Sequence, residues 1–138
     1  MRILICGDRE WNDLETMAKV FEWIIMQSPP PIIIHGACRG ADEMADACAK
    51  MAGLRVVSFP AHWSHSDVCP PNCKQKIGRG AGPIRNRKML NEGKPSLVFI
   101  FHNNIEHSKG SKDMFDQALQ DNILTYVVTS TKLPDFIG

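Results

Sequence analysis

The chain has 138 residues, 43% of them hydrophobic, which suits one ordinary domain with its own core. Its formal net charge is +1, from 16 basic and 15 acidic residues, which excludes a general attraction to nucleic acid or membrane surfaces. No apolar stretch approaches the roughly 20 residues of a membrane span, and the N-terminal apolar run is too short for a signal-peptide core. We therefore expect a cytoplasmic protein with no membrane partner.

The first predicted element is a buried strand over residues 2–6, a short apolar run closed by Gly7. A helix is expected behind it, because apolar side chains recur there at helical spacing. Asn12 is placed to cap this helix, with Glu15 three residues later as in a capping box, and the proline run from Pro29 ends it.

Two further strands and a helix follow. Residues 32–35 and 55–59 are apolar runs that predict strands. Between them, residues 41–52 carry a helical apolar stripe that Gly53 ends. This alternation of strand and helix favours parallel pairing.

The second half of the chain begins with a long loop at 60–82, and loops of this length in compact domains are usually functional or mobile. A helix is expected from Pro83 to about Asn91, because proline suits a first helical turn. The remaining elements are a strand at 97–101, a polar loop at 102–110, a helix at 111–121, a strand at 124–128 and a tail at 129–138.

This pattern predicts an α/β fold: a single Rossmann-like domain over residues 1–138 with a five-stranded parallel sheet and helices on both faces. Among doubly wound strand orders, 3-2-1-4-5 is the first choice and 2-1-3-4-5 the second. In such sheets, ligands bind outside the carboxyl ends of the strands, where the strand order reverses.

Polar segments gather at those strand ends. Glycine lets a backbone approach a phosphate, a helix start offers free N–H groups, and arginine pairs with phosphate in a bidentate manner. Three Gly-containing segments each carry arginine: Arg9, Arg39, and Arg85 or Arg87. The candidate ligand-binding residues are Gly7, Asp8, Arg9, Trp11, Gly36, Arg39, Gly40, Asp42, Trp63, Gly82, Arg85, Asn86, Gly110 and Ser111.

Several of these residues have two interpretations. Trp11 and Trp63 either cap the core or offer an aromatic face to a base. Asp8 and Asp42 are placed to accept hydrogen bonds from ribose hydroxyls, while Asp42 suits a helix cap equally well. His35, at the end of the second strand, is expected to be hydrogen-bonded structure more often than a catalyst.

The long loop holds a cluster of metal-ligating residue types. The candidate zinc ligands are His62, His65, Cys69 and Cys73. Their spacing matches no common zinc finger, so a polar flap with free thiols is the competing interpretation and no cofactor is certain. The chain has five cysteines, an odd count that argues against a disulfide framework.

The first helix carries a stripe that belongs to the core or to an interface, formed by Met17, Phe21, Trp23 and Ile25. Phe21 and Trp23 lie on this stripe, and their exposure would favour a homodimer.

Four segments together resemble a known family. They are Gly7-Asp8-Arg9-Glu10-Trp11, the run from His35 to Asp42, the run from Ala81 to Leu90, and Gly110-Ser111-Lys112-Asp113-Met114. They are similar to the YspA-like group of the SLOG superfamily, which also contains the Smf/DprA and lonely-guy proteins. The resemblance runs from Ile3 to Val128 and implies a Rossmannoid fold and a site for nucleotides or nucleotide-derived signals, including NAD-derived ones.

Lonely-guy enzymes hydrolyse an N-glycosidic bond, and this chain departs from their pattern. Met114 stands where their glutamate would activate water or stabilise an oxocarbenium-like transition state. Catalysis here would have to use other carboxylates, and the candidates are Asp113, Glu10 and Asp8.

Three functions follow. The first is binding or sensing of a phosphate-bearing nucleotide-type or NAD/ADP-ribose-type ligand. The second is hydrolysis of an N-glycosidic bond in such a compound. The third is binding of single-stranded DNA through the basic segment 74–80, which the near-zero net charge disfavours.

Overall fold

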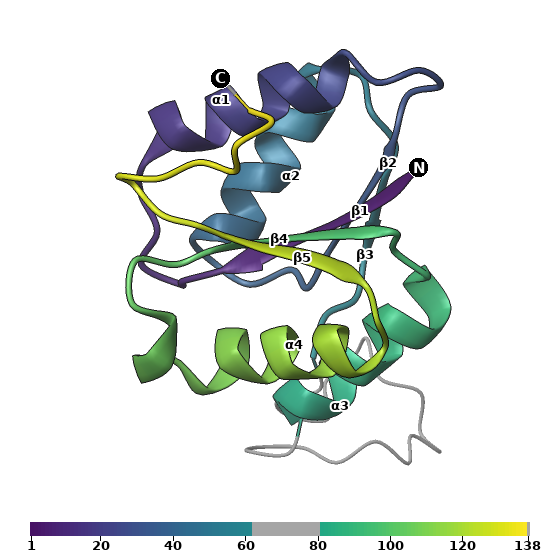
Figure 1. The fold of residues 1–138 in the computed structure, drawn as a ribbon. Coiled ribbons are helices and arrows are strands. Elements are labelled where there is room, and N and C mark those ends of the chain that lie inside the picture. The colour runs from purple at the N-terminus through teal and green to yellow at the C-terminus, as the bar shows by residue number, and fades with distance from the viewer. Residues whose placement is uncertain (62–80, 138) are drawn as a thin grey trace.

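The computed structural model describes residues 1–61 and 81–137, and these alternate between strands and helices (Figure 1). The strands are β1 (Arg2–Gly7), β2 (Ile32–His35), β3 (Val56–Ser58), β4 (Leu97–Phe101) and β5 (Leu124–Val128). The α-helices are α1 (Leu14–Ile25), α2 (Ala41–Met51), α3 (Ala81–Lys88) and α4 (Lys109–Gln120). A π-helical turn, η2 (Met89–Gly93), extends α3, and a 3-10 turn, η3 (Ile105–His107), precedes α4.

The strands form one parallel sheet in the order β3-β2-β1-β4-β5, which confirms the first-choice prediction. The register pairs Leu4 of β1 with Ile34 of β2 on one side and with Val98 of β4 on the other. The chain first builds outward from β1 to β3 and then returns to the other side of β1 to place β4. The strand order therefore reverses between β1 and β4.

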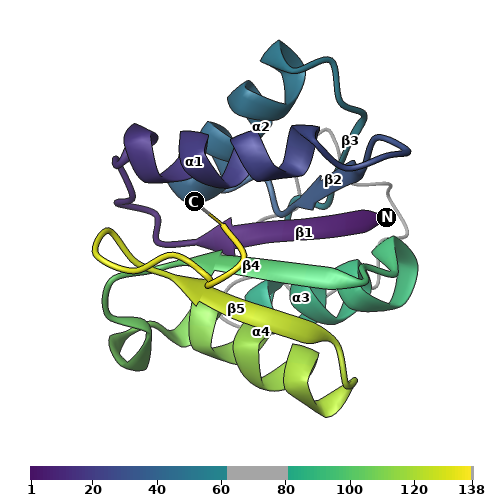
Figure 2. The same ribbon diagram turned by 45° about the horizontal axis from the view of Figure 1, so that its top comes forward.

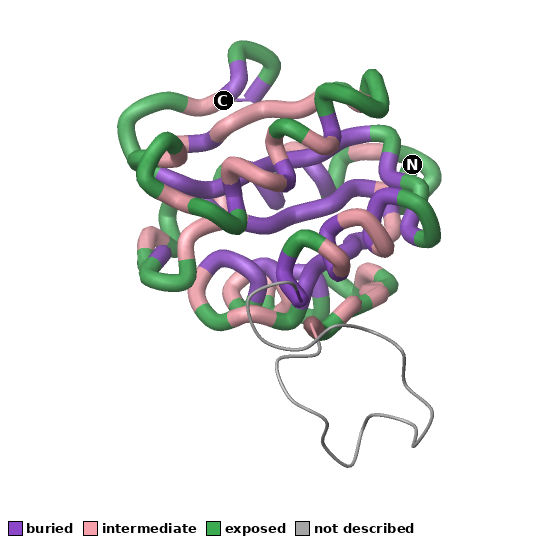
Figure 3. Tube along the Cα trace, turned by 90° about the horizontal axis from the view of Figure 1, so that it is seen from below, coloured by how far each residue is buried: buried purple, intermediate pink, exposed green. Residues whose placement is uncertain are grey.

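Helices cover both faces of the sheet: α1 and α2 lie on one face, and α3 and α4 on the other (Figures 1 and 2). Because successive side chains of a strand point to opposite faces, β1 supplies both cores. Ile3 and Ile5 pack into the core on the α1–α2 face. Leu4 and Cys6 pack into the core on the α3–α4 face. Figure 3 shows the buried positions concentrated in the central strands and on the helix sides that face the sheet.

Helix boundaries depart from prediction where a neighbouring polar side chain makes the better cap. Asp13, not Asn12, caps α1: its Oδ1 accepts from Thr16 N at 3.1 Å and its Oδ2 accepts from Thr16 Oγ1 at 2.6 Å. Helix α4 begins two residues early, at Lys109, because Ser108 Oγ accepts from Ser111 N at 3.1 Å.

The tail at 129–137 returns to the α1–α2 face, where Ile137 joins the core. Phe136 packs edge-to-face on Trp23 and Tyr126, with ring centroids 4.9 and 5.0 Å apart. Phe21 is buried, at 5% exposure, and Trp23 is partly buried against the same core. Neither aromatic of the first-helix stripe is therefore the exposed residue that would have favoured a homodimer.

Within the described ranges, none of the helices combines the length and the apolar character needed to cross a bilayer.

Candidate ligand-binding site

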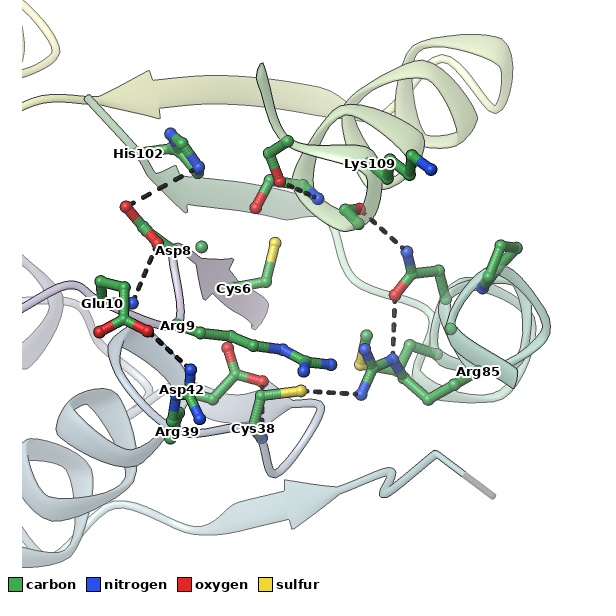
Figure 4. Close-up of a pocket in the computed structure, with 18 of the residues that line it drawn as sticks. Cys6, Asp8, Arg9, Glu10, Cys38, Arg39, Asp42, Arg85, His102 and Lys109 are labelled. Atoms are coloured by element: carbon green, nitrogen blue, oxygen red, sulfur yellow. Dashed lines mark hydrogen bonds and ion pairs between the residues drawn. The ribbon is translucent and has the colours of Figure 1, made fainter. Parts of the chain in front are cut away.

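A cavity of about 720 Å³ opens at the carboxyl ends of β1 and β4, the point where the strand order reverses. Its walls come from the turns after β1, β2 and β4 and from the starts of α3 and α4 (Figure 4). The described lining residues are Cys6, Gly7, Asp8, Arg9, Glu10, Cys38, Arg39, Asp42, Gly82, Pro83, Arg85, Asn86, Met89, His102, His107, Ser108, Lys109, Gly110 and Ser111.

The turn after β1 is tied to two neighbouring segments by the backbone of Asp8. Asp8 N donates to Phe101 O at 2.8 Å, and Asp8 O accepts from Ala41 N at 3.1 Å. The preceding Gly7 allows the approach to β4, because a Cβ there would lie 2.1 Å from Phe101 O. The position of the Asp8 side chain is therefore fixed by the ends of β1 and β4 and by the start of α2.

The turn after β2 is held by two buried charged side chains. Asp42 Oδ2 accepts from Gly36 N at 2.9 Å and from Cys38 N at 3.2 Å. Arg85 Nη1 donates to Gly36 O at 2.7 Å. The alternative in which Asp42 caps α2 is therefore wrong. The N-cap of α2 is Gly40, and Asp42 instead accepts the backbone N–H groups of the turn before the helix.

Burial sets the protonation preferences of two groups in the cavity wall. It raises the pKa of the Asp42 carboxyl, against the opposing effects of the Cys38 N–H group and the Arg85 guanidinium. It also raises the pKa of the Cys6 thiol well above its usual range, and the Asp42 charge adds to this shift. Cys6 is therefore a neutral thiol in the cavity wall at physiological pH.

His35 has the structural role that the sequence favoured. Its Nδ1 accepts from Ala37 N at 2.9 Å, so the neutral ring carries its proton on Nε2. Nε2 then donates to Asp46 Oδ1 at 2.8 Å. This hydrogen bond lowers the pKa of Asp46, second to the hydrogen bond from Lys50.

A chain of side-chain contacts joins α3 to α4. Arg85 Nε donates to Asn86 Oδ1 at 3.0 Å, and Asn86 Nδ2 donates to Asp113 Oδ2 at 2.9 Å and to Gly110 O at 3.3 Å. Gln117 Nε2 also donates to Asp113 Oδ2, at 2.7 Å. Asp113, a candidate acid or base, is absent from the described cavity lining and positions Asn86 instead.

The first turn of α4 faces the cavity through Lys109, Gly110 and Ser111. The first N–H groups of a helix have no carbonyl partner within it, and they carry a partial positive charge. A Cβ on Gly110 would meet no atom within 4 Å, so this position borders open space. Because Ser111 N already donates to Ser108 Oγ, Lys109 and Gly110 supply the backbone donors for an anion.

Arg9, Arg39 and Arg85 all line this cavity, rather than pointing to separate faces. Figure 4 shows Arg9 reaching across the opening toward Arg85. Arg39 Nη2 lies 2.6 Å from Glu10 Oε1 in an exposed ion pair, which contributes little stability and can be exchanged for a ligand. Arg87, the alternative to Arg85, instead pairs with Asp121 at 2.7 Å.

The structure places several other predicted residues away from the cavity. Trp11 is buried and packs edge-to-face on Phe101, with ring centroids 5.4 Å apart, which supports the core-capping alternative. Gly36 borders a smaller adjoining hollow of about 270 Å³. Gly40 supports the turn after β1 through close backbone contact with Asp8 and Arg9.

The remaining predicted residues lie outside the described residues. They are Trp63, the zinc candidates His62, His65, Cys69 and Cys73, and the basic segment 74–80. Among residues 1–61 and 81–137, no group of three His, Cys, Asp or Glu side chains is arranged to hold a metal ion.

Sequence reasoning missed His102, which lines the cavity with only 9% of its surface exposed. Its Nδ1 accepts from Asn104 N at 2.9 Å, and its Nε2 faces Asp8 Oδ2 at 3.9 Å. The sequence could have indicated His102, because it directly follows the fourth predicted strand and so lies at the same sheet edge as the predicted ligand-binding residues.

Comparison with known proteins agrees with the motifs. Residues 1–65 match the family described as YAcAr, the YspA, cpYpsA-related SLOG family. The chain is 32% identical over 96 residues to the Gene 61 protein of Mycobacterium phage D29, across 67% of this chain and 70% of the phage protein.

Solved structures share the fold. DNA processing protein A (DprA) from Streptococcus pneumoniae superposes with a TM-score of 0.70 at 16% identity, over 91% of this chain and 49% of DprA. UDP-GlcNAc 2-epimerase from Neisseria meningitidis, solved with UDP-GlcNAc bound, gives a TM-score of 0.54 at 14% identity, over 93% of this chain and 32% of the epimerase. The chain spans about half of DprA and about a third of the epimerase. The DprA likeness shows the shared fold, and the match over residues 1–65 with the phage relative shows that the chain belongs to the YspA, cpYpsA-related SLOG family.

Proposed function

We propose that the cavity binds a phosphate-bearing nucleotide or nucleotide-derived ligand, of which NAD- and ADP-ribose-type compounds are examples. The observation that carries this proposal is that Arg9, Arg39 and Arg85 line the same cavity as the first turn of α4. Guanidinium groups and free helix N–H groups are complementary to phosphate in charge and in hydrogen bonding. A ligand with one or more phosphates satisfies both sets of donors.

The size and position of the cavity support the proposal. Its volume of about 720 Å³ lies within the usual range for small-molecule sites. The switch point of a parallel sheet is where this class of fold binds its ligands. The SLOG resemblance points to the same ligand class, and the epimerase neighbour was solved with a nucleotide sugar.

Hydrolysis of an N-glycosidic bond is the second candidate, because the carboxylates of Asp8 and Glu10 also line the cavity. Its test is to incubate the protein with AMP, NAD and ADP-ribose and to look for released base. Formation of free base would make the protein an enzyme. DNA binding is disfavoured by the near-zero net charge, and the basic segment 74–80 proposed for it lies outside the described residues.

A charge introduced at Gly110 tests phosphate binding with little risk to the fold. An aspartate there has open space and is favourable in the first turn of a helix, but it repels an anion at the cavity wall. The matched control is Q120E, which makes the same charge change at an exposed position on the last turn of α4.

The measurement is titration calorimetry with AMP, ADP-ribose, NAD and inorganic phosphate, accompanied by thermal unfolding. We expect at least one nucleotide to bind the wild type and Q120E equally, and to stabilise the fold by about 2.7 kcal/mol at a concentration 100 times its Kd. We expect G110D to remain folded and to lose this binding. Equal binding by G110D, or binding of none of these compounds to the wild type, would contradict the proposal.

A further inference from the structure

Asp8 and His102 face each other across one corner of the cavity without reaching hydrogen-bonding distance (Figure 4). Asp8 Oδ2 lies 3.9 Å from His102 Nε2, whereas a direct hydrogen bond between a ring nitrogen and an oxygen requires about 2.7–3.2 Å. Asp8 and His102 therefore do not hydrogen-bond directly to each other at this corner.

The surrounding contacts fix which ring nitrogen of His102 is the donor. Asn104 N donates to Nδ1 at 2.9 Å, so Nδ1 must be the unprotonated nitrogen, and the neutral ring carries its proton on Nε2. His102 is about nine-tenths buried, and among the described residues no acceptor lies within hydrogen-bonding distance of Nε2. His102 lines the cavity, so this donor is open to water or to a ligand group that enters it.

The acceptor is equally well positioned. Glu10 N donates to Asp8 Oδ1 at 2.9 Å, which orients the carboxylate. The backbone of Asp8 is fixed by Phe101 and Ala41, as described above. Oδ2 is consequently directed toward His102, and the side chain stays about one-third exposed to the cavity.

A hydroxyl group complements this pair, because one O–H can donate to Asp8 Oδ2 while its oxygen accepts from His102 Nε2–H. A protonated amine or an ionised phosphate oxygen satisfies only one of the two. The ribose of a nucleotide carries hydroxyls at its 2′ and 3′ positions. If the arginines and the start of α4 hold the phosphate, one of these hydroxyls is the candidate group for Asp8 and His102.

We infer that Asp8 and His102 form a hydroxyl-binding corner that makes the site select ribonucleotide-type ligands over their deoxyribose analogues. This inference rests on the proposed function, because it assigns the sugar of the same ligand. His102 is then a specificity-determining residue, and Asp8 is a ligand contact rather than a proton carrier.

The test is titration calorimetry with AMP, 2′-deoxy-AMP and 3′-deoxy-AMP. We expect wild type to bind at least one of the deoxy compounds about 10-fold or more weakly than AMP, because the corner then has two unpaired groups.

D8N replaces the acceptor oxygen by a donor, and H102N keeps an acceptor for Asn104 N but removes the Nε2–H group. In both variants the ratio of ribo to deoxy affinity should fall toward one. In D116N, which removes an exposed carboxylate of α4, the ratio should equal that of wild type.

The outcomes separate this inference from the proposed function. If AMP and both deoxy compounds bind wild type equally, the hydroxyl-binding corner is wrong and phosphate binding stands. If none of them binds, and ADP-ribose, NAD and inorganic phosphate do not bind either, the proposed function fails and this inference fails with it. If AMP is cleaved to adenine and D8N stops the cleavage, the pair holds a water for hydrolysis, and the inference is overturned in favour of catalysis.

Discussion

Gly40 lies directly against the backbone of Asp8: a Cβ on Gly40 would be 2.3 Å from Asp8 O and 2.5 Å from Arg9 O. Gly40 also has φ +78° and ψ −122°, a conformation that only glycine adopts readily. The next residue, Ala41, donates its N–H to Asp8 O at 3.1 Å. The close approach of these two segments places Asp8 beside the start of α2.

This relationship predicts a large effect for G40A and a small one for G53A. Gly53 has a similar φ of +73°, but a Cβ there would meet nothing within 4 Å. Both substitutions place an alanine at positive φ, which costs about 1–3 kcal/mol. G40A adds a backbone collision, so we expect its free energy of unfolding to fall by roughly a further 1–3 kcal/mol. Urea unfolding of both variants measures the difference, and equal losses would show that the close contact is not significant.

Arg85 is predicted to support both the fold and ligand affinity. Lysine keeps the charge in R85K but cannot reproduce the planar contacts with Gly36 O and Asn86 Oδ1. We expect the free energy of unfolding to fall by about 1–3 kcal/mol and nucleotide affinity to fall about 10-fold or more. The control is R87K on the same helix, whose half-exposed pair with Asp121 is worth at most about 1 kcal/mol. If R85K and R87K change the free energy of unfolding and the nucleotide affinity equally, Arg85 is not part of the binding site.

Asp42 is predicted to make stability depend on pH in a defined direction. Burial raises the pKa of this carboxyl in the folded state. Its contribution to stability is therefore fully present below the unfolded pKa of about 3.9 and is lost as the pH rises through the folded pKa. D42N does not titrate there, so the free energy of unfolding of wild type minus that of D42N should decrease between pH 4 and pH 7. Urea unfolding at several pH values measures it, and a constant or increasing difference would contradict the assignment.

Cysteine reactivity is predicted to report on the cavity. Burial keeps Cys6 a neutral thiol, whereas Cys38 is half-buried in the cavity wall, 3.5 Å from Arg85 Nη1. Iodoacetamide at pH 8 should label Cys38 faster than Cys6, and a bound nucleotide should slow labelling of Cys38. Cys48 is half-buried on α2 outside the described cavity lining, so its labelling should not respond to the ligand. Peptide mapping by mass spectrometry assigns each site, and faster labelling of Cys6 would refute the prediction.

The sheet and its strand order could be predicted from the sequence because single helices separate the apolar runs. That pattern forces parallel pairing with right-handed crossovers, and few strand orders remain. The choice of Arg9, Arg39 and Arg85 followed from the same rule, since each belongs to a Gly-containing segment assigned to the carboxyl edge of the sheet, and all three line the cavity.

The details of the site could not be predicted, because they depend on contacts between segments far apart in the chain. Asp42 looked like a helix cap, but it reaches back to Gly36 and Cys38. Trp11 follows a strand like a ligand contact, yet the hydrophobic effect buries it on Phe101, 90 residues away in sequence. Local sequence signals give the position of a side chain along an element, but not the direction in which the packed fold turns it.

The most direct test of nucleotide binding in this cavity is an amide chemical-shift titration of the isotope-labelled protein with AMP. We expect the largest changes at Asp8 and at Lys109, Gly110 and Ser111, with little change at Ile24 in the opposite core. Shifts confined to residues outside the cavity wall, or no shifts at millimolar AMP, ADP-ribose and NAD alike, would contradict the account.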